Sequence, residues 1–108
     1  MIYIASPYTG TTNEMHERYK HARAYVAKLC VDYVLCYSPI VHFHPVAVNH
    51  ELPRDLNYWR AHNVAMLRRA EILHVLRLDG WDDSVGVAFE MNLAARLDLK
   101  IELIQWPE

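Results

Sequence analysis

Four short runs of apolar and β-branched residues recur along the chain, and longer segments with helical features separate them. The runs cover residues 1–5, 33–37, 72–78 and 101–104. Strands that alternate with helices are typical of βαβ units, in which the strands lie parallel and helices cover both faces of the sheet. The sequence therefore predicts one α/β domain over residues 1–108, a flavodoxin-like or Rossmann-like three-layer sandwich.

The order of the strands decides where a ligand can bind. Right-handed crossovers and a flavodoxin-like arrangement give a parallel sheet of four strands, at most five, in the order 2-1-3-4. The order reverses between the first and third strands, and ligands of such sheets bind at this switch point, beyond the carboxyl ends of the strands. We therefore expect two segments to line a cleft, Ser6 to Thr12 and Asp79 to Glu90.

Three segments carry clear helix signals. Thr11-x-x-Glu14 is a capping box, and the apolar residues that follow it recur at steps of three and four. Asp55 to Ala70 is rich in helix formers. Ser84 is a suitable N-cap for a helix that runs to about Leu97. These segments supply the helices that the alternating pattern requires.

Two further segments and the cysteines are predicted from weaker signals. Residues 33–37 are apolar at consecutive positions, which predicts a strand buried on both faces. Histidines and prolines crowd residues 40–53, so we expect that segment to be irregular, with at most one short turn of helix. The spacing of Cys30 and Cys36 matches neither a zinc knuckle nor a redox CxxC motif. We expect both to be buried thiols in a reducing cytoplasm.

The charge balance and hydropathy exclude several classes of partner. The formal net charge of -2 argues against polymeric nucleic acid, which proteins bind through concentrated Lys and Arg. No stretch reaches the roughly 20 apolar residues that a membrane span needs. Strand-like residues begin at Ile2, so no signal peptide fits. We expect a cytoplasmic protein whose partner is a small molecule.

The segment Gly80 to Glu90, GWDDSVGVAFE, carries the strongest functional signal. Ser84 at a helix start adds a hydroxyl to free backbone N–H groups, and the helix dipole there favours an anion such as phosphate. Gly86 removes a side chain where a ligand must come close. Glu90 lies one helical turn later on the same face, so its carboxylate points toward that space. The alternative is that Ser84 only caps the helix and Glu90 is a solvated surface residue.

The loop after the first strand faces the same predicted cleft. Ser6 begins this loop, and the phenol of Tyr8 can hydrogen-bond a carboxylate or a sugar hydroxyl. Thr9, Gly10 and Thr11 precede a helix and can donate to a phosphate. The alternative for Tyr8 is a tyrosine packed in a turn.

Three histidines after the second strand suggest two different roles. His42, His44 and His50 carry imidazoles, which are common metal ligands. No carboxylate or cysteine accompanies them in a known ligand spacing, so we expect no metal. Instead, we expect His42 and His44 to shape the pocket wall and contact substrate.

Aromatic and amide side chains complete the candidates. Trp81 follows the third strand, where a base can stack on its indole; the alternative is a hydrophobic lid or interface contact. Trp59 lies on a helical apolar stripe and is expected in the core. Asn63 lies on that stripe too, where its amide is either hydrogen-bonded in the core or turned toward the site.

Four segments together resemble the nucleoside 2-deoxyribosyltransferase superfamily. They are IYIASPYTG at 2–10, YSPIVHFHP at 37–45, NVAMLRRAEILHVL at 63–76 and GWDDSVGVAFEMNLA at 80–94. They stand in the superfamily's order and span nearly the whole chain. They are most similar to short proteins that resemble nucleoside 5'-monophosphate N-glycosidases.

The resemblance implies roles for several residues. It implies that Glu90 attacks the anomeric carbon and that Tyr8 helps to orient it. Transferases of this superfamily that act on free nucleosides tend to have an aspartate six residues before the nucleophile, whereas the hydrolases of nucleoside 5'-monophosphates have a serine. Ser84 occupies that position, so the resemblance implies a phosphorylated substrate.

One position departs from the superfamily's pattern. Relatives commonly have an aspartate where this chain has Asn63, and an amide cannot act as an acid or base near neutral pH. Either Asp82, Asp83 or a histidine protonates the leaving base, or the activity is reduced or lost.

The sequence and the resemblance together predict an N-glycosidase that needs no cofactor. Glu90 would form a glycosyl ester that water then hydrolyses, as in retaining glycosidases. A second base as acceptor would make the enzyme a deoxyribosyltransferase. The rivals are a nucleotide-binding protein without catalysis and a metal-dependent hydrolase. The resemblance also implies a homodimer or higher homo-oligomer, with Tyr58, Trp59 and Trp106 as candidate interface residues.

Overall fold

The computed structural model describes all residues from 1 to 108 and places four parallel strands in the order β2-β1-β3-β4. Along the chain the elements are β1 (Ile2–Ala5), α1 (Thr12–Val31), β2 (Cys36–Tyr37), α2 (Pro39–His50), α3 (Leu56–Leu67), β3 (Ile72–Leu76), a 3-10 turn η1 (Trp81–Asp83), α4 (Val85–Arg96) and β4 (Lys100–Ile104). The predicted fold class and strand order are confirmed. No helix has the length and apolar content that crossing a membrane requires.

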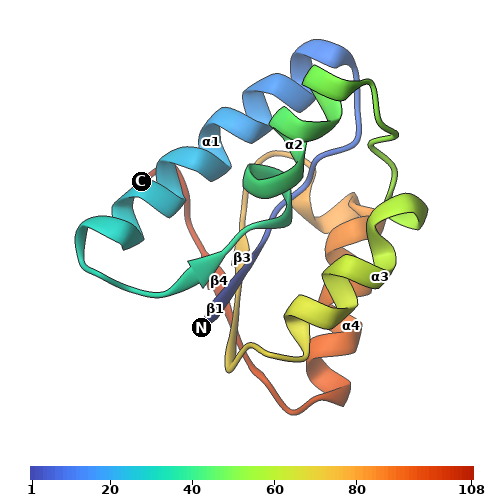
Figure 1. Cartoon of the computed structure of the whole chain (residues 1–108). Helices are drawn as coiled ribbons and strands as arrows, with labels where there is room; N and C mark the ends of the chain where they lie inside the picture. The colour runs from blue at the N-terminus through green and yellow to red at the C-terminus, as the bar shows by residue number, and fades with distance from the viewer.

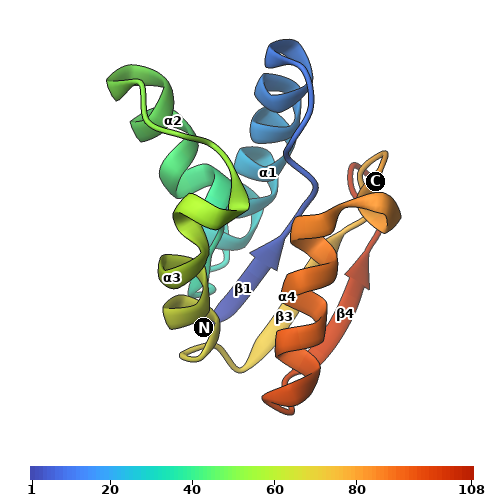
Figure 2. The same cartoon turned by 90° about the vertical axis from the view of Figure 1, so that its right-hand side faces the viewer.

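The sheet lies between two layers of helices (Figure 1). Side chains alternate along β1, so Tyr3 faces the core formed with α3 and α4 whereas Ile4 faces α1. In β3, Leu73 and Val75 face the first of these cores, and Leu76 faces the second. Figure 2 shows α4 lying over β3 and β4. Both faces of the central strands are therefore covered, as their apolar composition requires.

The helix starts at Thr11 and Ser84 form as predicted. The Thr11 hydroxyl accepts from the backbone N–H of Glu14, whose carboxylate accepts from the N–H of Thr11, which completes the capping box. The Ser84 hydroxyl accepts from the backbone N–H of Val87 at 3.2 Å. Both helices begin after the loops that follow the carboxyl ends of β1 and β3, the strands that flank the switch point.

Residues 39–50 form a helix, so the prediction of an irregular segment at 40–53 was wrong. Ser38 caps this helix through the backbone N–H of Val41, and Pro39 occupies the first turn, where a missing N–H costs nothing. Pro45 lies in the interior and removes one helical hydrogen bond. α2 packs against α1 through the apolar cluster of Tyr8, Ile40 and Phe43.

The second strand is shorter and more exposed than predicted. It comprises Cys36 and Tyr37 alone, because Tyr33 adopts a left-handed conformation with φ 58° that no strand allows. β2 is an edge strand, and Leu35 beside it is 77% exposed. The expectation of two buried thiols was also wrong, since Cys30 is exposed and Cys36 half-buried, and both are free.

The remaining boundaries differ from the predictions by a few residues. α3 ends at Leu67 rather than Ala70, and β3 ends at Leu76 rather than Leu78. Trp106, a predicted interface residue, is partly buried and donates its indole N–H to the His21 carbonyl at 2.9 Å.

Candidate functional site

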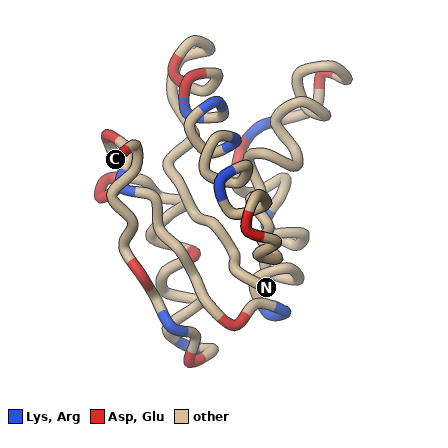
Figure 3. Tube along the Cα trace, turned by 90° about the vertical axis from the view of Figure 1, so that its left-hand side faces the viewer, with Lys and Arg blue, Asp and Glu red and all other residues tan.

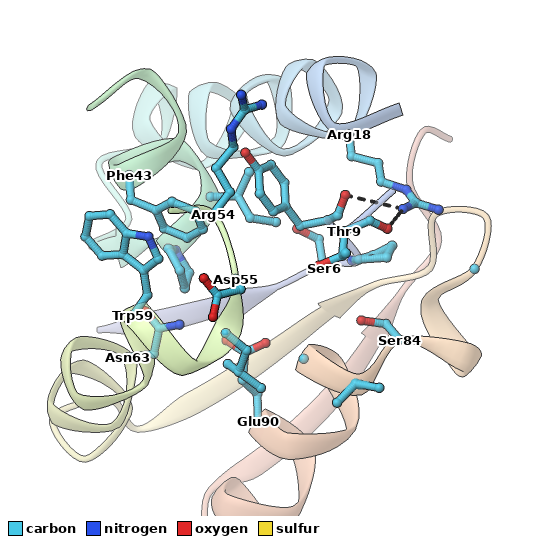
Figure 4. A pocket seen from close by; sticks show the side chains of 18 of the residues that line it. Ser6, Thr9, Arg18, Phe43, Arg54, Asp55, Trp59, Asn63, Ser84 and Glu90 are labelled. Carbon is cyan, nitrogen blue, oxygen red and sulfur yellow. Dashed lines mark hydrogen bonds between the residues drawn. The ribbon is translucent and has the colours of Figure 1, made fainter. Parts of the chain in front are cut away.

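A cavity of about 390 Å³ opens at the switch point, beyond the carboxyl ends of β1 and β3 (Figure 4). Its walls come from the loop after β1, α1, the start and middle of α2, the loop before α3 and α3 itself, and the segment from Gly80 into α4. The lining residues are Ser6, Pro7, Tyr8, Thr9, Arg18, Pro39, Ile40, Phe43, Arg54, Asp55, Leu56, Trp59, Asn63, Gly80, Asp83, Ser84, Val85, Gly86 and Glu90. Both segments that the sequence analysis expected around a cleft contribute to it.

Glu90 is buried at the base of this cavity. It is 6% exposed, although it projects from α4 into the cavity. The hydroxyl of Tyr3, itself fully buried in β1, donates a hydrogen bond to the Glu90 Oε2 atom. Burial raises the pKa of Glu90 to about 8, and the Tyr3 hydrogen bond opposes this rise. Glu90 is therefore not the solvated surface residue of the alternative interpretation.

Tyr8 lines the cavity but does not contact Glu90 as the resemblance implied. Its hydroxyl is paired with the Nδ1 atom of His44, which is 5% exposed. Burial lowers the pKa of His44, and the charges of Arg54 and His16 lower it further, so the imidazole is neutral near pH 7. The expected contact between a tyrosine and the carboxylate does exist, but Tyr3 supplies it.

One end of the cavity is suited to an anion. The first turn of α4, with Ser84 and Gly86, lines it on one side. On the other side, Arg18 donates to the Thr9 carbonyl at 2.7 Å and to the Asp79 carbonyl at 3.3 Å, and thus holds together the loops after β1 and β3. A methyl group added at Gly86 would have Ser84 Oγ, at 3.8 Å, as its one close neighbour, so this helix face is open. Backbone N–H groups, a hydroxyl and a guanidinium thus lie around one space.

The opposite end of the cavity is aromatic. The rings of Phe43 and Trp59 are stacked with centroids 4.7 Å apart and an interplanar angle of 17°. The indole N–H of Trp59 donates to the Pro53 carbonyl at 2.8 Å, which fixes the ring against the cavity. Trp59 is half-buried and packs against the apolar cluster of Tyr8, Ile40 and Phe43, as expected of a core residue, but it also lines the cavity. Its flat face is suited to a heteroaromatic ligand.

Two buried polar atoms beside the cavity have no partner. The Ser6 hydroxyl and the Oδ1 atom of Asn63 make no hydrogen bond, and both residues are less than 8% exposed. An unpaired buried polar atom costs about 1–3 kcal/mol. Since both residues line the cavity, a polar ligand would satisfy these atoms.

Five of the predicted substrate contacts lie outside the cavity. Gly10 and Thr11 immediately precede α1, and the Thr11 side chain is occupied as its N-cap. His42 is exposed and stacks on His62 with centroids 5.2 Å apart. Trp81 packs against the core under the guanidinium of Arg77. His44 reaches the site only through Tyr8.

Several site residues were not found from the sequence. Tyr3 lies in the first strand, Arg18 in a helix, and Arg54 and Asp55 in the loop before α3. For Arg54 and Asp55, the sequence offered one indication, namely that they are charged residues after a segment rich in histidine and proline. Of the two aspartates considered as proton donors, Asp83 lines the cavity and Asp82 does not.

The structure gives no support to the metal hypothesis. No group of three or more His, Cys, Asp or Glu side chains is placed to hold a metal ion. His42, His44 and His50 all belong to α2, and they differ in surroundings, because His44 is buried while the other two are exposed.

Comparison with known proteins identifies the family. A search among curated proteins gave no match. The family model described as "Domain of unknown function (DUF1937)" matches residues 1–105, which is nearly the entire chain and includes every residue that lines the cavity. The chain therefore belongs to the DUF1937 family.

Proposed function

We propose that this protein hydrolyses the N-glycosidic bond of a nucleoside 5'-monophosphate, with Glu90 as the nucleophile. The observation that carries the proposal is a buried carboxylate at the base of a cavity, between an end suited to an anion and an aromatic end. The resemblance to the nucleoside 2-deoxyribosyltransferase superfamily supports the same assignment through the segments that contain Tyr8, Ser84 and Glu90.

The two ends of the cavity suggest how such a substrate would lie. The phosphate would bind near Ser84, Gly86 and Arg18, and the base would stack on Trp59. The sugar would then lie between them, with its anomeric carbon above Glu90. Elsewhere, acidic and basic residues are interspersed over the fold (Figure 3), which favours a small anion over a nucleic acid chain.

The first half of the reaction forms an ester. A carboxylate oxygen of Glu90 bonds to C1' as the bond from C1' to the base nitrogen breaks, and the electron pair stays on the base, which takes a proton from solvent. Glu90 must be ionised for this step. Because burial raises the pKa of Glu90 to about 8, most of the protein has protonated Glu90 at pH 7 in the empty site. The Tyr3 hydrogen bond favours the ionised form.

The second half of the reaction decides between a hydrolase and a transferase. Attack of water on C1' releases sugar phosphate, whereas attack by a second base gives a new nucleotide. We propose hydrolysis as the principal outcome.

A test is incubation at pH 8 with a panel of ribo- and deoxyribonucleoside 5'-monophosphates and their parent nucleosides, with free base measured by chromatography. We expect base release from at least one monophosphate by the wild type and none by Glu90→Gln, which keeps the size of the side chain. Faster release from nucleosides than from monophosphates would contradict the phosphate assignment. Formation of a new nucleotide when a second base is added would identify a transferase.

A nucleotide-binding protein without catalysis is the second candidate. Asn63 favours it, because an amide replaces the carboxylate common among the relatives. It predicts that a monophosphate binds saturably and is recovered intact after prolonged incubation.

We also propose that the chain forms a homo-oligomer. Of the predicted interface residues, Tyr58 is 52% exposed and remains available, whereas Trp59 and Trp106 are occupied within the fold. Sedimentation at micromolar concentration is expected to give a dimer or larger species, and a monomer would contradict this.

A further inference from the structure

The carboxylate of Asp55 does not cap α3, although Asp55 stands at the N-cap position of that helix. Asp55 is the N-cap residue of α3, where an aspartate ordinarily accepts a hydrogen bond from the first turn. Here the side chain makes no capping hydrogen bond. It lines the cavity instead, and in Figure 4 it points inward on the side where Asn63 and Glu90 lie. The Asp55 carboxylate thus forgoes a capping hydrogen bond to α3 and points toward the space of the proposed substrate.

Hydrolysis of a glycosyl ester needs a base that Glu90 cannot supply, because Glu90 is then part of the ester. Asn63 lies beside that ester, but its amide cannot accept a proton near neutral pH. His44 is kept from the cavity by its pairing with Tyr8. The remaining carboxylates that line the cavity are Asp55 and Asp83.

The two carboxylates differ in the end of the cavity that they line. Asp83 directly precedes Ser84 at the anion-binding end, where the proposed phosphate would repel it and fill the space. Asp55 directly precedes α3, which also carries Trp59 and Asn63 at the aromatic end. Departure of the base empties that end, so water can enter beside Asp55.

We propose that Asp55 is the general base for the hydrolytic half of the reaction, which rests on the function proposed above. The Asp55 carboxylate takes a proton from a water molecule as the water oxygen bonds to C1'. The bond from C1' to the Glu90 oxygen breaks, and its electron pair returns to the Glu90 carboxylate. The proton then passes from Asp55 to solvent. Asp55 thus acts from the loop before α3 in place of an acid or base at position 63.

The test compares Asp55→Ala and Asp55→Asn with the wild type on the monophosphate that the wild type cleaves fastest in the panel. Asp98→Asn is the matched control, because Asp98 lies outside the cavity, beyond the far end of α4, and its left-handed φ of 57° suits asparagine. The measurements are turnover, base released in the first cycle, intact protein mass, and turnover with added sodium azide, which needs no general base.

We expect both Asp55 variants to release about one equivalent of base rapidly and then to turn over about a hundredfold or more slower than the wild type. Their mass should increase by one sugar phosphate, because the ester accumulates. Azide should restore turnover of Asp55→Ala at least about tenfold, with a sugar azide as product. Asp98→Asn should match the wild type.

Two results would overturn the assignment of Asp55. One is turnover of both variants at the wild-type rate. The other is slow turnover with no mass increase and no effect of azide, which would indicate a purely structural role. If the wild type itself releases no base from any nucleotide, the proposed function is wrong, and so is the role of Asp55. The wild-type sample alone distinguishes this failure from a failure of the Asp55 assignment.

Discussion

Glu90→Gln should change how the stability of the protein depends on pH. The pKa of Glu90 is raised to about 8 in the folded protein from an ordinary value of 4.5. Between these two values the folded state holds a proton that the unfolded state has lost. The contribution of Glu90 to stability is therefore greatest below pH 4.5, falls as pH rises through this window, and levels off above about pH 8.

The magnitude follows from the width of the window. Linkage gives a loss of about 2 to 3 kcal/mol between pH 5 and pH 7, and about 4 kcal/mol between pH 5 and pH 9, from Glu90 alone. Glutamine is neutral at every pH, so the variant lacks this loss. The amide oxygen introduced by Glu90→Gln can still accept the hydrogen bond from Tyr3, so the packing is kept.

Urea unfolding at pH 5, 7 and 9 measures the effect in both proteins. With a slope of about 1.5 kcal/mol per molar urea, the midpoint of the variant should rise relative to the wild type by roughly 1.3 to 2 M from pH 5 to pH 7. Other titrating groups such as His44 and His74 are present in both proteins and cancel in the difference. A difference in midpoint that stays constant from pH 5 to pH 9 would refute the claim that Glu90 is buried and protonated.

Three further predictions concern the cavity. The kcat/KM of the wild type should rise about tenfold per pH unit up to about pH 8 and then level off. Tyr3→Phe should shift this rise to higher pH, because the Tyr3 hydrogen bond lowers the pKa of Glu90. A pH-rate profile that is flat from pH 6 to 9 would contradict this. Gly86→Ala should leave the free energy of unfolding unchanged or raise it by up to about 1 kcal/mol, because alanine favours a helix more than glycine does. It should lower nucleotide affinity, since the added methyl enters open space beside Ser84. Unchanged affinity by calorimetry would count against a ligand at this helix face. Trp59→Ala should weaken nucleotide binding about tenfold to a hundredfold. Tyr33→Asn, at an exposed residue outside the cavity whose left-handed φ suits asparagine, should change it less than about threefold. Equal effects of the two variants would contradict the assignment of the base to Trp59.

The sheet and its switch point could be predicted because the relevant signals are local. The capping box at Thr11, the N-cap at Ser84 and the glycine at position 86 act within one helical turn, and the structure forms them as the sequence indicates. Right-handed crossovers together with a flavodoxin-like arrangement then give the strand order. The position of Glu90 in the cavity follows from its place one turn after Gly86.

The second strand and α2 were mispredicted because a proline or an apolar residue is each compatible with two different local structures. Pro39 can end a strand, and it can also occupy the first turn of a helix, as it does here. Only the end of the strand was predicted from it. Leu35 is apolar as a buried strand residue would be, yet it is exposed at the sheet edge. The difference depends on which neighbours the folded chain brings near.

The contacts within the site could not be predicted because they join distant parts of the chain. Tyr3 and Glu90 are 87 residues apart, and Tyr8 and His44 are 36 apart. Both tyrosines lie near the first strand, and the alternation of strand faces directs Tyr3, not Tyr8, toward α4. For Trp59, periodicity identified the helix stripe, but the stripe extends past the core to the cavity.

The most direct test of the account is to trap the bond between the sugar and Glu90. Nucleoside 5'-monophosphates that carry fluorine at C2' slow the breakdown of a glycosyl ester, because fluorine disfavours the positive charge that develops at C1'. After incubation of the wild type with a mixture of such analogues, intact mass spectrometry should show an increase equal to one fluorinated sugar phosphate, and peptide mapping should place it on Glu90. An unmodified protein under conditions in which the analogues lose their base, or a modification on another residue, would contradict the central claim that Glu90 is the nucleophile.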